Sequence, residues 1–319
     1  MTRSYRIAFA SCVLMLLTLV ADLGDRSAMA EDADSMFVAN LFDARYQIFA
    51  DTFRESPDTQ TRLQLTKEAG KDLNQILQEH LTSDAIVKLL PKLEKVRIVK
   101  LDTSFIKIID AHPKRDTRAR ALLSFAKYAG NNERLKTCKA TLDYLSQQYG
   151  HLKFQEGRSY ADEADEAKYF YTHLAVGAKA PAMVGEDADG AVFRLDDYRG
   201  KVVVLRFWGD WCPACRAMYP YERKLVEKFK NQPFALIGVN SDSLERCKKS
   251  QRESDLMWRT VWDGGTTNGP VATVFRVHNW PTIVVIDADG VIKYRAEGLD
   301  ERKLDRVLER CIQSAMQAT

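Results

Sequence analysis

Two cysteines separated by two residues are the side chains of this chain best suited to chemistry. They lie in the segment 208–215, with the sequence WGDWCPAC, directly after a nearly continuous apolar run over residues 201–208. Such a run is typical of a strand at the centre of a sheet. Pro213 suits the first turn of a helix, where its missing N–H costs nothing. The pattern therefore predicts a strand that ends just before Cys212 and a helix that begins just after it.

This placement predicts a reactive thiol at Cys212. The free N–H groups and the dipole of a helix N-terminus stabilise a thiolate, and such positions lower a cysteine pKa to roughly 3.5–7.5. Cys215 follows one helical turn later and is predicted to be less exposed. It could attack a mixed disulfide formed on Cys212 and release the partner in its reduced form. We therefore expect thiol–disulfide exchange, with Cys212 as the nucleophile and Cys215 as the resolving thiol.

Two other uses of the cysteine pair are alternatives. A structural zinc site needs four ligands, and the sequence contains no second CxxC or Cys/His pair that would complete one. A purely structural disulfide, flanked by Trp208 and Trp211, is the second alternative. The glycine-rich stretch 263–270 contains neither a P-loop nor a dinucleotide-binding pattern, so it predicts a turn before a short helix.

The elements around the cysteines predict an α/β domain. Short apolar runs that read as strands cover residues 192–195, 201–208, 234–239, 282–286 and 291–295, and helical stretches cover 213–230, 243–254 and 300–317. Strands that alternate with helices favour this fold class.

Residues 31–175 contain no convincing strand and show helical periodicity instead. One helix is predicted from Pro113 to Gly130, and a second from Asn132 to Gly150, so that the two form a hairpin. Stacked helical repeats need about three such units, and we find one. We therefore predict an all-α domain over 31–175, only weakly solenoid-like, and an α/β domain over 176–319.

The first 30 residues have the features of an export signal. Arg3 and Arg6 precede the apolar or small residues 7–21, and Ala28-Met29-Ala30 offers small residues at a cleavage site. An uncleaved membrane anchor is the alternative. Export predicts a compartment in which disulfides persist, here the bacterial periplasm or cell envelope.

Composition excludes several classes of protein. The 319 residues are 45% hydrophobic and 29% charged, with a mean hydropathy of −0.33. This balance excludes a disordered chain and a multi-spanning membrane protein. A net charge of +3 gives no reason to expect a nucleic-acid partner. Six cysteines are too few for a disulfide-stapled scaffold. Cys12 lies in the export segment, and Cys138 and Cys311 fit apolar helical faces as buried thiols.

From residue 177 onward the sequence resembles the thioredoxin superfamily, and in particular the exported TlpA/ResA-like thiol–disulfide oxidoreductases of the AhpC/TSA-redoxin type. The motifs that carry the resemblance are GAKAP at 177–181, LDDYRGK at 195–201, FW at 207–208, WCPAC at 211–215 and WPT at 280–282. The resemblance implies a thioredoxin fold for the C-terminal domain and protein disulfides as substrates.

The resemblance also assigns roles to individual residues. Pro281 should be a cis-proline that faces Cys212, and Trp211, Trp280, Pro281 and Thr282 should contact an extended substrate segment. Trp208, Pro213, Ala214 and Arg206 are expected to support the active site. The redox-active disulfide Cys212–Cys215 would serve in place of a separate cofactor. A membrane or periplasmic protein would donate electrons.

Three positions depart from the pattern of the relatives. Ala214 stands where many relatives have proline, and the residues between the cysteines tune the stability of the thiolate. Arg206 stands where thioredoxins bury an aspartate. Arginine cannot act as a base, but it would favour the thiolate if it approached the thiols. Gly209 stands where a peroxiredoxin would need threonine, which argues against a peroxidase.

Two further functions are alternatives. By analogy with thioredoxin-fold metallochaperones, Cys212, Cys215 and His278 could hold copper, although His278 is more simply an exposed bystander. The chain could instead be an interaction module that works through its helical domain. A thioredoxin sheet would place Cys247 and Cys311 under helices on opposite faces, so no bridge between them is expected.

Overall fold

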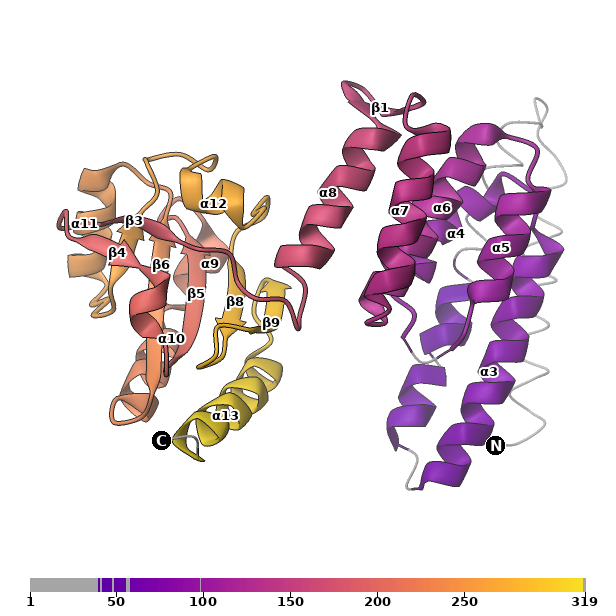
Figure 1. Cartoon of the computed structure of the whole chain (residues 1–319). Coiled ribbons are helices and arrows are strands. Elements are labelled where there is room, and N and C mark those ends of the chain that lie inside the picture. The colour runs from indigo at the N-terminus through magenta and orange to yellow at the C-terminus, as the bar shows by residue number, and fades with distance from the viewer. Residues whose placement is uncertain (1–39, 41, 48, 56–57, 98, 318–319) are drawn as a thin grey trace, which may run out of the picture. The chain divides into compact units, whose positions relative to one another are not determined.

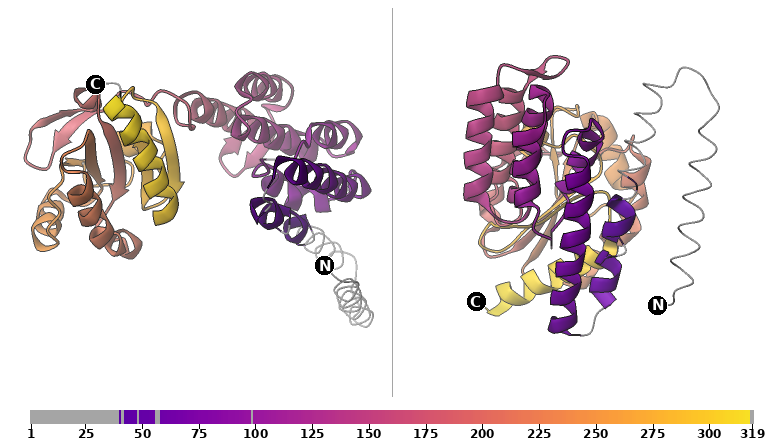
Figure 2. Two further views of the ribbon diagram at one scale, coloured as in Figure 1. Left: turned by 90° about the horizontal axis from the view of Figure 1, so that it is seen from below. Right: turned by 90° about the vertical axis from the view of Figure 1, so that its right-hand side faces the viewer.

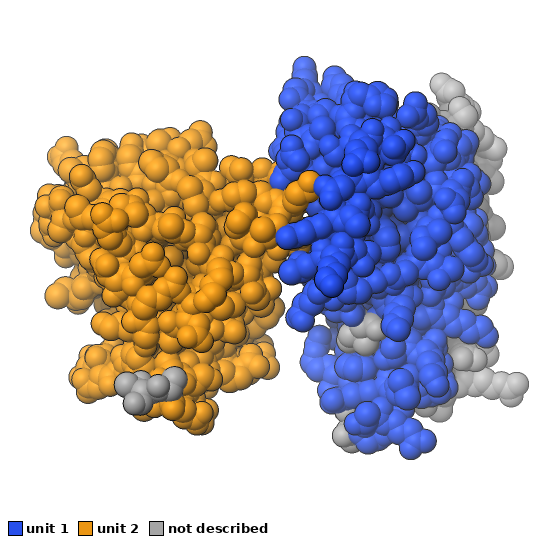
Figure 3. Space-filling view, viewed as in Figure 1, with its two compact units in different colours: residues 1–165 blue, residues 166–319 orange. Residues whose placement is uncertain are grey.

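The computed structural model describes residues 40–317, apart from residues 41, 48, 56–57 and 98 (Figure 1). The predicted export signal over 1–30 lies outside the described residues. Within the described part, no helix is both long and apolar enough to cross a membrane. The chain divides into two compact units, residues 1–165 and 166–319 (Figure 3).

The first unit is built from helices, as expected. They include α3 (Thr59–Glu79), α4 (Ala85–Leu93), α5 (Asp102–Ala111), α6 (Arg115–Asn131), α7 (Leu135–Tyr149) and the start of α8 (Tyr160–His173). Helices α6 and α7 form the predicted hairpin, and Cys138 lies fully buried on the inner face of α7 beside Leu142 and Leu145. A small antiparallel pair that the sequence did not predict, β1 (Lys153–Gln155) and β2 (Arg158–Ser159), joins α7 to α8.

The division between the units falls ten residues before the predicted boundary, inside α8. The helix does not end where the first unit ends. Its later residues Tyr169 and Phe170, with the buried Leu174 that follows it, pack into a hydrophobic cluster of the second unit. These apolar side chains follow the helical period, which is why the sequence predicts that they belong to the helical domain.

The second unit is built on a seven-stranded mixed sheet with the order β4-β3-β7-β6-β5-β8-β9. The strands are β3 (Val184–Asp187), β4 (Val192–Arg194), β5 (Val202–Trp208), β6 (Phe234–Asn240), β7 (Thr260–Trp262), β8 (Thr282–Ile286) and β9 (Ile292–Glu297). Strand β5 runs parallel to β6 and antiparallel to β8. The helices of this unit are η1 (Leu195–Tyr198), α9 (Pro213–Ala217), α10 (Tyr219–Phe229), α11 (Leu244–Glu253), α12 (Pro270–Val274) and α13 (Glu301–Gln317).

Side chains of the fully buried strand β5 alternate between two cores. Val202, Val204 and Trp208 enter the cluster that contains residues of α9, α10 and α13, whereas Val203, Leu205 and Phe207 enter the cluster that contains residues of α12. Helices therefore cover both faces of the sheet (Figures 1 and 2). This arrangement confirms the expected thioredoxin-type α/β unit, and it explains why the segment reads as a continuous apolar run.

Two local expectations were wrong. The helix predicted over 213–230 is broken into α9 and α10 at Met218, two residues before Pro220, which has no N–H for a continuous helix. Cys247 and Cys311 do not belong to opposite faces, because both side chains lie in the same buried cluster. Each is nevertheless a free cysteine, as is Cys138.

Candidate active site

The register of the central strands brings the cysteine pair and Pro281 to the same end of the sheet. Phe207 near the end of β5 lies opposite Thr282 at the start of β8. The segment that follows β5 and the segment that precedes β8 therefore emerge side by side. The Trp280–Pro281 peptide bond is cis, as the resemblance implied. Pro281 itself is buried, and its carbonyl oxygen accepts a hydrogen bond from the N–H of Gly298 at 2.8 Å.

Cys212 occupies the N-cap position of α9, and Pro213 begins the helix. The N–H of Cys215 donates to the Cys212 sulfur at 3.1 Å, and the two cysteines form a disulfide with their Cα atoms 5.2 Å apart. The exposed fraction is 4% for Cys212 and 0% for Cys215. A backbone N–H directed at the sulfur favours its charged form, which is the environment that the sequence predicts for a nucleophilic thiolate.

Two tryptophans flank the disulfide. The ring centres of Trp211 and Trp280 lie 5.9 Å apart, and Trp211 is 43% exposed. Gly209 permits this position of Trp211, because a Cβ at residue 209 would collide with the indole ring. Replacing Gly209 by threonine, the residue that a peroxiredoxin has at this position, would therefore require Trp211 to move.

The other residues predicted around the disulfide differ in exposure. Pro213 and Ala214 are exposed on the first turn of α9, and Trp208 is fully buried beneath it. Thr282 is 1% exposed and lies between β5 and β9, and its hydroxyl donates to the carbonyl oxygen of Asn279 at 2.7 Å. The Thr282 side chain therefore helps to hold the loop that carries Pro281.

A polar network that the sequence did not predict holds the residues just before Cys212. The backbone N–H of Asp210 donates to the buried carboxylate of Asp242 at 2.7 Å. The Asp210 carboxylate accepts hydrogen bonds from Ser250 at 2.8 Å and from Arg246 at 3.1 Å. Burial raises the pKa of Asp210, but these two donors and the charges of Arg246 and Arg216 outweigh it and leave the pKa below its ordinary value.

Arg206 is fully buried and reaches the main chain of the cysteine pair. Its Nη2 donates to the carbonyl oxygen of Cys215 at 2.6 Å, and its Nε forms an ion pair with Glu222 of α10. The guanidinium carbon lies 5.1 Å from the ring centres of both Trp208 and Tyr219. The sequence alone predicts neither the direction of the Arg206 side chain nor its ion pair with Glu222. The available clue was an acidic residue on a helical face shared with Tyr219, Leu225 and Phe229.

The surroundings of the other three described cysteines disfavour a thiolate, because burial raises the pKa of each thiol. Burial raises the pKa of Cys138 to about 11. Burial, with the charge of Asp242, raises the pKa of Cys247 to about 12. The pKa of Cys311 is also raised by burial. These three thiols therefore lack the environment that favours a thiolate at Cys212.

The copper alternative gains no support from the part of the chain that the structure describes. That part contains no group of three or more His, Cys, Asp or Glu side chains that could hold a metal ion, and His278 is exposed.

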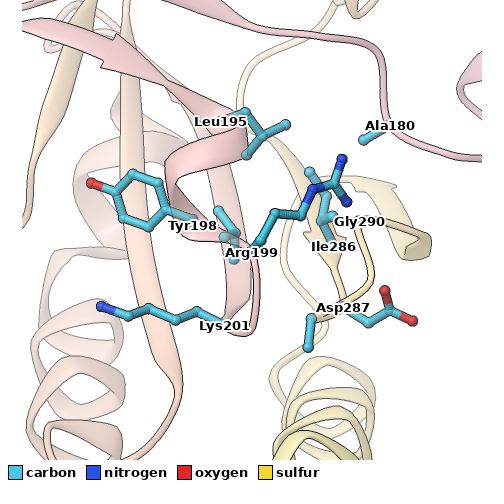
Figure 4. Close-up of a pocket in the computed structure, with 10 residues that line it drawn as sticks. Ala180, Leu195, Tyr198, Arg199, Lys201, Ile286, Asp287 and Gly290 are labelled. Carbon is cyan, nitrogen blue, oxygen red and sulfur yellow. The ribbon is translucent and has the colours of Figure 1, made fainter.

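A separate small pocket lies at the other end of the central strands, next to the start of β5 and the end of β8 (Figure 4). Arg199 fills one side of this pocket and donates to the carbonyl oxygen of Asp289 at 2.6 Å. The pocket contains no cysteine. The cysteine pair, rather than this pocket, is therefore the candidate site for chemistry.

Comparison with known proteins agrees with this geometry. The sequence model described as the AhpC/TSA family matches residues 176–295, all within the second unit. Thiol-disulfide oxidoreductase ResA of Geobacillus kaustophilus is 34% identical over 140 residues, which are 43% of this chain and 79% of that protein. ResA of Bacillus thuringiensis subsp. konkukian is 31% identical over 126 residues, 39% of this chain and 71% of that one.

A solved structure was also matched. The thioredoxin domain of a thiol-disulfide oxidoreductase from Bacteroides vulgatus is 31% identical, with a TM-score of 0.40; the match covers 44% of this chain and 99% of that domain. The two ResA proteins are each matched over more than two thirds of their length. Their name, thiol-disulfide oxidoreductase, agrees with the disulfide-bonded CxxC pair at the start of α9. The chain therefore belongs to the ResA-like thiol–disulfide oxidoreductases of the AhpC/TSA family.

Proposed function

We propose that the protein exchanges electrons with protein disulfides outside the cytoplasm, with Cys212 as the nucleophile and Cys215 as the resolving thiol. The observation that carries the proposal is the hydrogen bond from the Cys215 N–H to the Cys212 sulfur at the N-terminus of α9. An N–H donor and a helix N-terminus both stabilise the thiolate that attacks. The redox-active disulfide then suffices without a separate cofactor.

The exchange has two steps. The Cys212 thiolate attacks one sulfur of a substrate disulfide, and the other substrate sulfur leaves as a thiolate. The Cys215 thiolate then attacks the Cys212 sulfur of this mixed disulfide, which releases the second substrate thiolate and forms the Cys212–Cys215 disulfide. The substrate gains two electrons and the protein loses two. The reverse sequence oxidises a substrate dithiol, so the reduction potential sets the direction of the reaction.

A substrate segment would meet the exposed surface beside the disulfide. Trp211, Pro213 and Ala214 are exposed there, and Trp280 is half-buried beside Trp211. Aromatic side chains of this kind supply a large contact area at little entropic cost. We therefore assign substrate contact to Trp211 and Trp280, next to the loop that carries Pro281. Reduced protein would be regenerated by another thiol–disulfide protein of the membrane or periplasm.

Two cysteine variants test the roles. Cys212→Ser should abolish the reduction of insulin disulfides in the presence of dithiothreitol. Cys215→Ser should accumulate a mixed disulfide with the substrate, because the resolving attack is missing. Cys138→Ser is the matched control, since Cys138 is a free, fully buried cysteine of the first unit, and it should keep full activity. Undiminished activity of Cys212→Ser would overturn the assignment.

Export is tested separately. When the full chain is expressed in a bacterium with two membranes, the mature protein should appear in the periplasmic fraction and should lack residues 1–30 by mass spectrometry. A chain of full mass in the membrane fraction would instead favour an uncleaved anchor.

A further inference from the structure

Arg206 carries a charge in the apolar core directly beneath the cysteine pair. Its side chain is 1% exposed and that of its partner Glu222 is 2% exposed. The side chains that enclose the pair are mainly apolar, and they include Val204, Met218, Leu225, Leu236, Ile283 and Leu304. Arginine remains charged when buried, and a buried ion pair is often no more stabilising than apolar residues of the same volume. Its presence here is therefore poorly explained by packing alone.

The pair has a defined direction relative to the cysteines. Glu222 contacts the Nε side of the guanidinium, whereas Nη2 donates to the carbonyl oxygen of Cys215. The positively charged guanidinium therefore contacts Cys215 directly. The negatively charged Glu222 carboxylate, on α10, contacts the guanidinium at another nitrogen. The break between α9 and α10 permits this contact, because among the described residues the Cys215 carbonyl accepts one backbone N–H, that of Met218, at 3.1 Å.

We propose that Arg206 is a positioning residue of the exchange reaction. Its hydrogen bond to the Cys215 carbonyl holds the resolving cysteine in place. Its positive charge, partly offset by Glu222, stabilises the Cys215 thiolate. This stabilisation raises the reduction potential of the Cys212–Cys215 couple. A positive charge in a medium of low dielectric constant favours a nearby thiolate. A more stable thiolate stabilises the reduced form and makes the disulfide more oxidising. The inference rests on the proposed roles of the two cysteines.

Glu222 makes the effect depend on pH. Burial raises the pKa of Glu222 to about 7, against the attraction of Arg206 and Arg223. Tyr219 also faces the pair, and burial raises its pKa, so it stays neutral at physiological pH. From α13, Asp305 accepts a hydrogen bond from Tyr221 at 2.8 Å. Above about pH 7 the Glu222 carboxylate offsets the charge of Arg206, whereas below that pH the charge of Arg206 is unopposed.

The test is the thiol–disulfide equilibrium constant of the full chain with glutathione, measured by quenching and mass spectrometry. Glu222→Gln at about pH 8 leaves Arg206 unopposed and should shift the constant about tenfold toward the reduced form, which is about 30 mV for a two-electron couple. At about pH 6 the same variant should differ little from the parent protein. Arg206→Met should shift the constant in the opposite direction.

Removing one partner of a buried pair is strongly destabilising, so the double variant Arg206→Met/Glu222→Met provides a second measurement. It replaces the pair by apolar side chains and should shift the constant toward the disulfide, as Arg206→Met does. In a Cys212→Ser background, the pKa of Cys215 should fall with Glu222→Gln and rise with the double variant. Tyr221→Phe is the matched control, because it removes the hydrogen bond to Asp305 from the same helix and should leave the constant unchanged.

Shifts of the same sign in Glu222→Gln and the double variant, or no shift in either, would overturn the proposal. The equilibrium constant requires no turnover of a protein substrate. Loss of insulin reduction without opposed shifts would therefore bear on the proposed function and not on the Arg206–Glu222 pair.

Discussion

The carboxylate of Asp242 accepts a hydrogen bond from the backbone N–H of Asp210, two residues before Cys212, with 2.7 Å between nitrogen and Oδ2. Asp242 follows the end of β6 and is itself held by the side-chain amide of Asn240 at 2.8 Å. Because β6 pairs with β5 along its whole length, the neighbouring strand fastens the loop that carries the nucleophile.

Replacing Asp242 by alanine should therefore loosen this loop. The N–H of Asp210 would lose its buried acceptor, which costs roughly 1–3 kcal/mol, and insulin reduction should slow because Cys212 is less well placed. Asp242→Asn should lose less, since the amide oxygen still accepts. Urea unfolding and the insulin assay measure the two effects. Asp196→Asn, which removes a charge from an exposed ion pair with Arg199, should change neither. Equal stability of Asp242→Ala and the parent would contradict the role.

The sequence predicts those parts of the site that depend on residues adjacent in the chain. The helix start at Pro213, the N-cap position of Cys212 and the loop that carries Pro281 each depend on residues adjacent in the chain. Arg206 meets Glu222, and Asp210 meets Asp242, only because the fold brings separate segments together. The edge strands β3 and β7 were missed for a related reason. They have four and three residues, and Glu186 and Asp187 interrupt any apolar run in β3.

Deprotonation of Glu222 should lower the free energy of unfolding as the pH rises from about 4.5 to about 7. Its pKa in the folded protein is raised by burial to about 7 from an ordinary value of 4.5. Between these values the folded state holds a proton that the unfolded state has released, so the free energy of unfolding falls with rising pH. The total change is on the order of 3 kcal/mol.

Glu222→Gln isolates this contribution, because the other carboxyl groups are common to both proteins. The free energy of unfolding by urea, measured at several pH values, should fall less steeply for the variant between about pH 4.5 and 7 and should run parallel to the parent above that range. Parallel curves throughout would show that Glu222 is ionised in the folded state at every pH tested.

Trp211→Ala should weaken substrate binding more than it changes redox equilibrium. Trp211 is 43% exposed and contacts Trp280 with 5.9 Å between ring centres. Loss of that aromatic contact costs roughly 0.5–1.5 kcal/mol, so the fold should persist. We expect a severalfold higher KM for a protein disulfide and a nearly unchanged equilibrium constant with glutathione. Met257→Ala, at a site that is 80% exposed, controls for the loss of a surface apolar side chain. An unchanged KM in Trp211→Ala would remove Trp211 from the substrate surface.

Alkylation of the reduced protein separates electrostatic activation of a thiol from its simple exposure. Cys311 is 9% exposed and Cys212 is 4% exposed, whereas Cys138 and Cys247 are fully buried. Exposure alone would therefore make Cys311 react first. Burial raises the pKa of Cys311, however, and raises that of Cys138 to about 11. At pH 7 a thiol with a pKa of about 11 is ionised in about one molecule in ten thousand.

Cys212 differs from these thiols by the N–H of Cys215 and the start of α9. We therefore expect iodoacetamide at pH 7 to modify Cys212 at least tenfold faster than Cys138, Cys247 or Cys311, with peptide mass spectrometry as the readout. In urea, where the helix and the core are lost, the described cysteines should react at similar rates. If Cys311 reacted first in the folded protein, access would outweigh electrostatics, and the proposed activation of Cys212 by the N-terminus of α9 would be wrong.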